Sequence, residues 1–112
     1  MDSISATAAL EALSNETRLD VFRLLVRAGP EGLAAGDVAE RLGVVQNTMS
    51  SHLHKLARAG IISRRRQSRH IIYAVEFATV RELVLFLLED CCGGSAAVCE
   101  PVIESLGCQE SP

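Results

Sequence analysis

Apolar residues recur at helical spacing through the N-terminal part of the chain, and turn-forming residues interrupt the pattern. Residues 5–13 are rich in alanine and leucine and predict a first helix. Ser14 and Asn15 end this helix and can cap a second one, because their side-chain oxygens accept hydrogen bonds from free backbone N–H groups. Gly29 and Pro30 end the second helix. The stripe that this helix is expected to bury consists of Leu19, Phe22, Leu25 and Val26.

Two shorter helices with a turn between them are expected next. Residues 33–36 are interpreted as a connector, and Asp37 as the N-cap of a third helix. Gly43 is expected to end that helix in the left-handed conformation, which glycine adopts at little cost. A fourth helix is predicted over residues 46–59, and Gly60 ends it. Two short helices joined by a glycine-containing turn predict a helix-turn-helix.

The fourth helix has two different faces. Met49, Leu53 and Leu56 fall at helical spacing and are expected to face the core. The opposite face has short polar side chains in its first turn, which can approach base edges, and cations further along, which can reach phosphates. The pattern is typical of a recognition helix in the DNA major groove, although an ordinary amphipathic surface helix shares it. The candidate DNA-binding residues of this helix are Gln46, Asn47, Thr48, Ser50, Ser51, His54, Lys55 and Arg58.

A basic hairpin is predicted directly after this helix. The β-branched runs at residues 61–62 and 71–73 flank a mostly cationic segment, which predicts two strands with a basic tip. A helix-turn-helix followed by such a hairpin is a winged helix, so the expected fold is mainly α with a β-hairpin wing (α+β). The wing can follow the DNA backbone or enter the minor groove, where arginine is favoured. Its candidate DNA-binding residues are Arg64, Arg65, Arg66 and Arg69.

The last predicted helix, over residues 76–90, predicts self-association. Residues 83–88 are apolar through more than one turn, so the helix is apolar on every face there. A small domain has too little chain to cover all these faces, and the alternative is a helix buried within a monomer. We expect a homodimer through the first and last helices, whose two recognition helices would bind an inverted-repeat operator in double-stranded DNA.

Charge is strongly segregated along the chain. Residues 46–73 contain six of the eleven Lys and Arg residues, all three His and no Asp or Glu. The rest of the chain carries all fourteen acidic residues, and the net charge of the whole chain is −3. A basic segment without acidic residues is typical of a surface that binds a polyanion, and a solvated basic face without a partner is the alternative.

Length and composition limit the remaining function classes. The 112 residues are expected to form one domain over residues 1–92, followed by a tail over residues 93–112. The N-terminus does not resemble a signal peptide and the longest apolar run is too short to cross a bilayer, so a cytoplasmic location without membrane contact is expected. No cysteine precedes a phosphate-cradling loop and no Cys-x-x-Cys opens a helix, so an enzyme is not expected.

All four cysteines lie in the last 22 residues, with the spacing C-C-x6-C-x8-C. The paired C-x2-C elements of structural zinc sites are absent. Thiolates from Cys91, Cys92 and Cys99 would suit trivalent arsenic or antimony, and Cys108 would be a fourth ligand for a tetrahedral metal or a spare thiol. A reversible disulfide, a structural metal site and incidental thiols are the alternatives.

Four segments of the chain, which belong to three motifs in the same order, resemble the ArsR/SmtB-type metalloregulatory repressors over about residues 8–90. These are Ala-Leu-Ser-Asn-Glu-Thr-Arg-Leu at residues 12–19, Ser-Ser-His-Leu at residues 50–53, and the segments at residues 59–62 and 65–73. The resemblance implies a homodimeric winged-helix repressor that leaves its operator when an inducer binds. The chain departs from the family pattern at Val45, where a capping serine is common, and at Ser68, where the wing turn often has glycine.

The resemblance also bears on the inducer. The third helix has no cysteine and the last lacks the Asp, His and Glu set of the zinc-sensing members, so neither of those family sites is expected. The sequence Glu-Asp-Cys-Cys-Gly at residues 89–93, together with Cys99, resembles an arsenite-responsive subgroup. This implies arsenite, As(III), as inducer, and Sb(III) as a related one. A thiol-redox or persulfide sensor would need only two cysteines, such as Cys92 and Cys99, whereas a zinc or cadmium sensor would also need Cys108.

Overall fold

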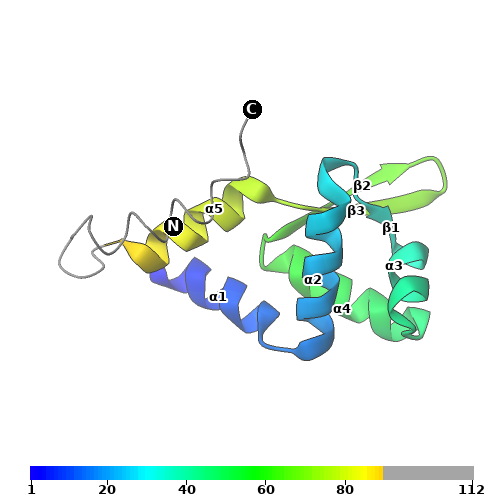
Figure 1. Cartoon of the computed structure of the whole chain (residues 1–112), viewed down its shortest axis with the longest axis horizontal. Helices are drawn as coiled ribbons and strands as arrows, with labels where there is room; N and C mark the ends of the chain where they lie inside the picture. The colour runs from blue at the N-terminus through cyan, green and yellow to red at the C-terminus, as the bar shows by residue number, and fades with distance from the viewer. Residues whose placement is uncertain (90–112) are drawn as a thin grey trace.

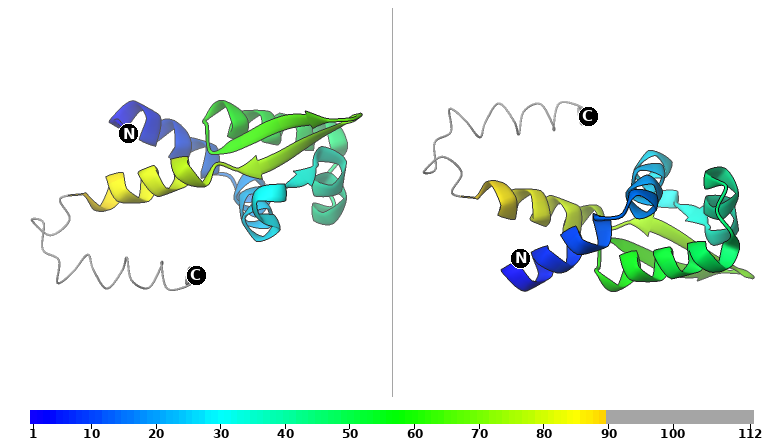
Figure 2. Two further views of the ribbon diagram at one scale, coloured as in Figure 1. Left: turned by 90° about the horizontal axis from the view of Figure 1, so that it is seen from above. Right: turned by 90° about the horizontal axis from the view of Figure 1, so that it is seen from below.

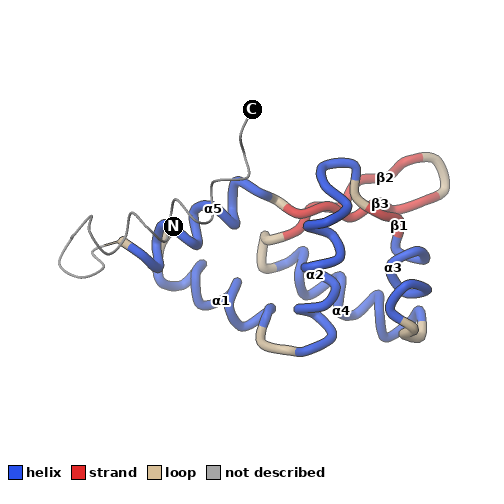
Figure 3. Tube along the Cα trace, viewed as in Figure 1, coloured by secondary structure: helices blue, strands red, loops and turns tan. Residues whose placement is uncertain are grey.

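The computed structural model describes residues 1–89, which form five α-helices, one 3₁₀ helix and a three-stranded antiparallel sheet. In chain order the elements are α1 (Ser3–Leu13), α2 (Glu16–Ala28), η1 (Gly29–Glu31), β1 (Leu33–Ala34), α3 (Ala35–Leu42), α4 (Gln46–Arg58), β2 (Ile62–Gln67), β3 (His70–Val75) and α5 (Phe77–Leu88) (Figure 1). Helices α1 and α5 occupy one end of the molecule, and the sheet and α3 the other (Figure 3). The predicted fold, mainly helical with a β-hairpin wing, is confirmed.

The first two helices begin at side-chain caps. The Asp2 carboxylate accepts a hydrogen bond from the Ser5 N–H at 2.8 Å, so α1 begins slightly earlier than the sequence predicts. The Asn15 Oδ1 accepts a hydrogen bond from the Arg18 N–H at 3.0 Å, which confirms the predicted cap of α2. Each bond satisfies a backbone donor that the helix itself cannot satisfy.

The prediction of which face of α2 is buried is wrong in part. Val21 and Leu25 are completely buried, whereas Leu19 is 42% and Val26 is 40% exposed. Phe22 lies between the two faces and is half-buried. Apolar residues follow helical spacing on two adjoining faces of this helix, and only the face that carries Val21 and Leu25 is completely buried. Periodicity alone cannot identify which of two such faces is covered.

The predicted connector before α3 contains a strand. Leu33 and Ala34 form β1, which pairs with Tyr73 and Ile72 of β3, so the strand order is β1-β3-β2. Gly32 immediately before it has a positive φ of 71°, and a Cβ atom there would overlap the carbonyl oxygen of Tyr73. Glycine therefore permits the close approach of β1 to the central strand of the sheet.

The prediction for α3 is wrong at the N-terminal end of the helix and correct at its C-terminal end. Asp37 is not the N-cap, because the helix begins at Ala35 and Ala34 stands at the capping position without a side-chain hydrogen bond. Asp37 lies instead in the first turn, where a negative charge interacts favourably with the helix dipole. Gly43 ends the helix in the left-handed conformation at a φ of 65°, as predicted.

The hydrophobic core lies between the helices and the inner face of the sheet, and the hairpin of β2 and β3 extends beyond it (Figure 2). Helix α5 contributes Leu83 to this core but exposes 52% of both Leu85 and Leu87. No helix within residues 1–89 is long and apolar enough to span a membrane. The largest completely buried side chains are Leu25, Met49, Leu53, Leu56, Ile61, Val21 and Val38.

Candidate nucleic-acid interface

Helix α4 is held by apolar residues on one side and is open to solvent on the other. Met49, Leu53 and Leu56 have no exposed surface, which confirms the predicted inner face. The side chains expected to contact DNA lie outward, and Val45 at the N-cap position provides no side-chain hydrogen bond to the first turn. The exposed candidates on this helix are Gln46, Asn47, Thr48, Ser50, Ser51, His54, Lys55 and Arg58.

The wing presents its arginines on both faces of a regular two-stranded ladder. Arg64 pairs with Tyr73, Arg65 with Ile72, and the ladder continues to the turn. Successive side chains in a strand point to opposite faces, so Arg64 and Arg66 share one face and Arg65 lies on the other. All four predicted wing residues, Arg64, Arg65, Arg66 and Arg69, are exposed.

One wing arginine also anchors the hairpin to the rest of the domain. The Arg65 Nη2 donates a hydrogen bond of 3.0 Å to the carbonyl oxygen of Glu31 in η1. Among residues 1–89, Arg64, Arg66 and Arg69 make no such bond, so their guanidinium groups have free donors. These free, exposed donors fit phosphate oxygens, which arginine can bind through two N–H groups at once.

The wing turn contains a strained serine, and its replacement by glycine is expected to stabilise the fold. Ser68 has a φ of 58°, a left-handed conformation that is unfavourable for residues with a Cβ atom. Ser68→Gly is therefore expected to raise the free energy of unfolding by about 0.5 kcal/mol, after allowance for the greater freedom of glycine in the unfolded chain. Thermal unfolding followed by circular dichroism would show a rise of about 2–4 °C in Tm.

Ser63→Gly is the matched control for this turn variant. Ser63 lies in β2, and its Oγ donates a hydrogen bond of 3.4 Å to the Ala74 carbonyl oxygen. Glycine there removes this bond and weakens a strand, so Tm is expected to fall. A lower Tm for both variants would contradict the strain assigned to Ser68.

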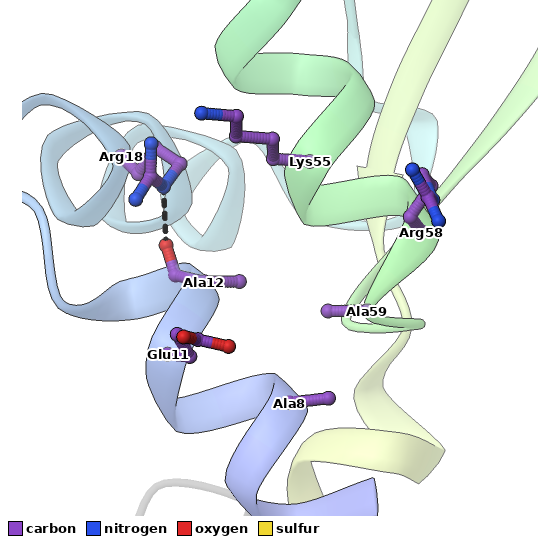
Figure 4. A pocket seen from close by; sticks show the side chains of 7 residues that line it. All are labelled: Ala8, Glu11, Ala12, Arg18, Lys55, Arg58 and Ala59. Atoms are coloured by element: carbon purple, nitrogen blue, oxygen red, sulfur yellow. Dashed lines mark hydrogen bonds between the residues drawn. The ribbon is translucent and has the colours of Figure 1, made fainter.

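Arg18 joins the turn between α1 and α2 to α4, and the sequence did not predict a role for it. Its Nε donates a hydrogen bond of 2.6 Å to the Ala12 carbonyl oxygen near the end of α1 (Figure 4). Its Nη1 lies 3.3 Å from the Nδ1 of His52 on α4. The available signal was an arginine in the first turn of a capped helix, but no sequence spacing identifies a partner 34 residues away.

A cavity of about 440 Å³ lies beside this contact, between α1 and α4 (Figure 4). Alanine methyl groups line it, and charged side chains from three helices surround them. The cations come from α2 and α4, whereas the carboxylate of Glu11 comes from α1. The lining residues are Ala8, Glu11, Ala12, Arg18, Lys55, Arg58 and Ala59.

The environment of His52 favours its neutral form. Its pKa is lowered from the ordinary value of 6.5, first by partial burial and then by the positive charges of Arg18 and Lys55. Arg18 has only N–H donors, so the hydrogen bond between them requires an unprotonated Nδ1 as acceptor. The neutral imidazole then carries its proton on Nε2.

The predicted thiolate site lies outside the described residues. Cys91, Cys92, Cys99 and Cys108 all follow residue 89, as does the predicted domain boundary at residue 92. Within residues 1–89, no group of three or more His, Cys, Asp or Glu side chains is arranged to hold a metal ion. The ligand role of these cysteines therefore remains a prediction from the sequence.

Comparisons with known proteins agree with the helix-turn-helix that the structure contains. A family model described as a helix-turn-helix domain matches residues 13–65. The transcriptional activator HlyU of Vibrio cholerae is 28% identical over 86 residues, which are 77% of each chain. The transcriptional repressor SdpR of Bacillus subtilis is 30% identical over 78 residues, 70% of this chain and 83% of SdpR. The putative arsenical resistance operon repressor ArsR2 of Halobacterium salinarum is 31% identical over 81 residues, 72% of this chain and 66% of ArsR2.

Solved structures give the same picture. HlyU from V. cholerae is 28% identical and superposes with a TM-score of 0.64 over 80% of this chain and 95% of HlyU. Reduced HlyU, also 28% identical, superposes with a TM-score of 0.62 over 80% of this chain and 92% of that chain. The homodimeric winged helix-turn-helix DNA-binding domain of Mb0332 from Mycobacterium bovis has a TM-score of 0.61 over 79% of this chain and 82% of that domain. Its identity of 23% supports the shared fold alone. The relatives include an activator and repressors, and all of them regulate transcription. Together with the exposed recognition helix and basic wing, these similarities show that the chain belongs to the ArsR/SmtB-type family of winged helix-turn-helix transcriptional regulators.

Proposed function

We propose that this protein represses transcription by binding operator DNA as a homodimer, and that trivalent arsenic releases it. The observation that carries the DNA-binding part is the surface of α4 and the wing. Polar first-turn residues such as Asn47 and Thr48 are exposed there, together with six cations, and residues 46–73 contain no acidic side chain. In the complex, α4 lies in the major groove and the wing arginines contact the backbone or the adjacent minor groove.

The proposed dimer is supported by the apolar surface at the α1 and α5 end of the molecule. Ile4 of α1 is 82% exposed, and Leu85 and Leu87 of α5 are each 52% exposed. Exposed apolar side chains on two helices that contact each other favour a partner that covers them, and a two-fold axis would bring the same residues of two copies together. The two recognition helices would then contact successive major grooves, so the proposed operator is an inverted repeat.

The proposed inducer is supported by the cysteines that follow α5 and by the chemistry of thiolates. Cys91, Cys92 and Cys99 provide three soft sulfur donors, which suit trivalent arsenic and antimony. The relative ArsR2 is named as a putative arsenical resistance operon repressor. In the proposed mechanism these three residues bind the metalloid together, and this changes the end of α5 and the spacing of the two recognition helices. A preference of about 1–3 kcal/mol for the weak-binding arrangement reduces operator affinity about 5- to 150-fold.

A thiol-redox or persulfide sensor is the second candidate. One of the solved structures similar to this chain is that of reduced HlyU. Two cysteines of this chain, such as Cys92 and Cys99, would suffice for a reversible disulfide. This candidate predicts release by oxidant and no release by arsenite under reducing conditions.

Substitution of a wing arginine tests the proposed DNA contact. Arg66→Ala is expected to weaken binding to specific and scrambled duplexes alike, because Arg66 would contact phosphates. The slope of the logarithm of affinity against that of salt concentration should decrease by about 2 for a dimer, or about 1 for each subunit. Fluorescence anisotropy of a duplex selected by the wild-type protein from a random-sequence pool measures both quantities.

The matched control is Arg23→Ala, which removes an exposed arginine of α2. Its salt slope should equal that of the wild type. An unchanged slope for Arg66→Ala would exclude the phosphate contact, and failure of the wild-type protein to select any duplex would contradict the proposed function itself.

A further inference from the structure

Three helices meet at the guanidinium group of Arg18. The side chain belongs to α2, donates a hydrogen bond to the Ala12 carbonyl oxygen of α1, and contacts His52 of α4. Arg18 is half-buried, so its surroundings restrict the directions in which it can extend. The contact therefore connects the helix at the proposed dimer interface to the helix that carries the candidate base-reading residues.

The other anchors of α4 at its inner face are apolar. Met49, Leu53 and Leu56 resist removal of the helix from the core, but apolar contacts are not directional. A hydrogen bond depends strongly on angle and distance, so the contact with Arg18 restricts small rotations and sliding of α4. His52 lies directly between exposed Ser51 and buried Leu53 in the chain, so a rotation of α4 that moves the reading face also displaces the His52 ring from Arg18.

We propose that Arg18 is a positioning residue, which sets the orientation of α4 through its hydrogen bond to neutral His52 and thereby determines sequence-specific DNA binding. This inference rests on the proposed DNA-binding function. Arg18 acts here without touching the DNA, so it affects the choice of sequence more than the attraction to phosphates.

Protonation of His52 would break this arrangement. An imidazolium has no acceptor nitrogen, and its charge would lie beside Arg18 of α2 and Lys55 of α4 itself. Among the charged groups of residues 1–89, these two cations affect the pKa of His52, while Glu11 of α1 lines the cavity shared with them. The pKa of His52 is lowered in the folded arrangement, so the arrangement is favoured above the ordinary value of 6.5 and is lost as pH falls through the lowered value.

The test compares specific with non-specific binding over a range of pH. The probes are the duplex selected by the wild-type protein and a scrambled duplex of equal length, and the measured quantity is the ratio of their Kd values from about pH 8 to about pH 5.5. The ratio cancels much of the contribution of other histidines to phosphate binding. For the wild type it should fall about threefold to tenfold as pH falls through the lowered pKa of His52, the factor that one ordinary hydrogen bond controls.

The variants separate positioning from other roles. Arg18→Met and His52→Leu should show the low ratio at every pH. His52→Asn should restore the high ratio without a pH dependence, because the asparagine Oδ1 accepts a hydrogen bond near the position of Nδ1 and does not titrate. The salt slope of Arg18→Met should equal that of the wild type, whereas a direct phosphate contact would reduce it. Circular dichroism at each pH verifies folding, and Arg18→Leu, which also lacks a donor, replaces Arg18→Met if the latter unfolds.

Two results would overturn the inference. One is a wild-type ratio in Arg18→Met, or in Arg18→Leu where that variant is used. The other is a pH profile of His52→Asn that matches that of the wild type. Loss of all binding selectivity by the wild-type protein would instead refute the proposed function, so the two failures are distinguishable.

Discussion

Replacement of Leu85 by arginine is expected to convert the protein into a folded monomer and to weaken binding to an inverted-repeat duplex more than about 100-fold. Leu85 exposes 52% of its surface within one subunit, so a charged side chain there should not disturb the monomer core. At a two-fold interface, however, the same change places two cations in an apolar contact, where their desolvation opposes association. Each subunit then binds one half-site alone, without the gain from linking two contacts.

Sedimentation and anisotropy together measure this expected result. Val26→Arg is the matched control, because Val26 is 40% exposed and lies on α2, outside the proposed interface. It should remain a dimer with the wild-type affinity. A dimeric Leu85→Arg protein with full operator affinity would show that α5 does not form the interface. Disruption of the dimer by Val26→Arg would show that α2 forms it instead.

Replacement of Cys99 by serine is expected to leave operator affinity unchanged and to abolish release by arsenite. Two thiolates hold trivalent arsenic less tightly than three, because serine does not provide a soft sulfur donor. The wild-type protein should lose about 5- to 150-fold in affinity when arsenite saturates it, and the variant should lose none. Anisotropy of the reduced proteins on the selected duplex, titrated with arsenite and separately with zinc, gives both values.

Cys108→Ser is the internal control for this prediction. A three-thiolate site should release DNA equally well with or without Cys108. Release by zinc that depends on Cys108 would favour a tetrahedral metal sensor instead. If arsenite releases the Cys99→Ser protein from DNA to the same extent as the wild type, the three-thiol site is contradicted. If only an oxidant releases the wild-type protein from DNA, the redox sensor is favoured.

The sequence was most informative where one face of a helix differs clearly from the other. Met49, Leu53 and Leu56 of α4 were predicted to face inward because polar residues occupy the opposite side, and all three are buried. Helix α2 has apolar residues on adjoining faces, so the buried position of Val21 and the exposure of Leu19 depend on which elements pack against the helix. Which elements pack against a helix depends on the tertiary structure and cannot be read from the spacing of apolar residues in the sequence.

Short and long-range features were the least predictable. The strand β1 has only two residues, too few for an alternating pattern, and it exists because β3 offers an unpaired edge. The contact between Arg18 and His52 joins residues far apart in the chain, and its geometry follows from the packing of α2 against α4. The exposure of the candidate DNA-binding residues, in contrast, could be predicted from the sequence, because it requires only a local excess of cations and an amphipathic helix.

The exposure of the reading face of α4 also has an evolutionary consequence. Asn47, Thr48 and Ser51 contribute nothing to the core, so most replacements there should change folding stability by less than about 0.5 kcal/mol. Residues such as Gly32, in contrast, accept no side chain without displacement of a strand. Under the proposed function, two copies of the protein that arise from a gene duplication can therefore acquire different target promoters through a few changes on α4, while the rest of the fold stays the same.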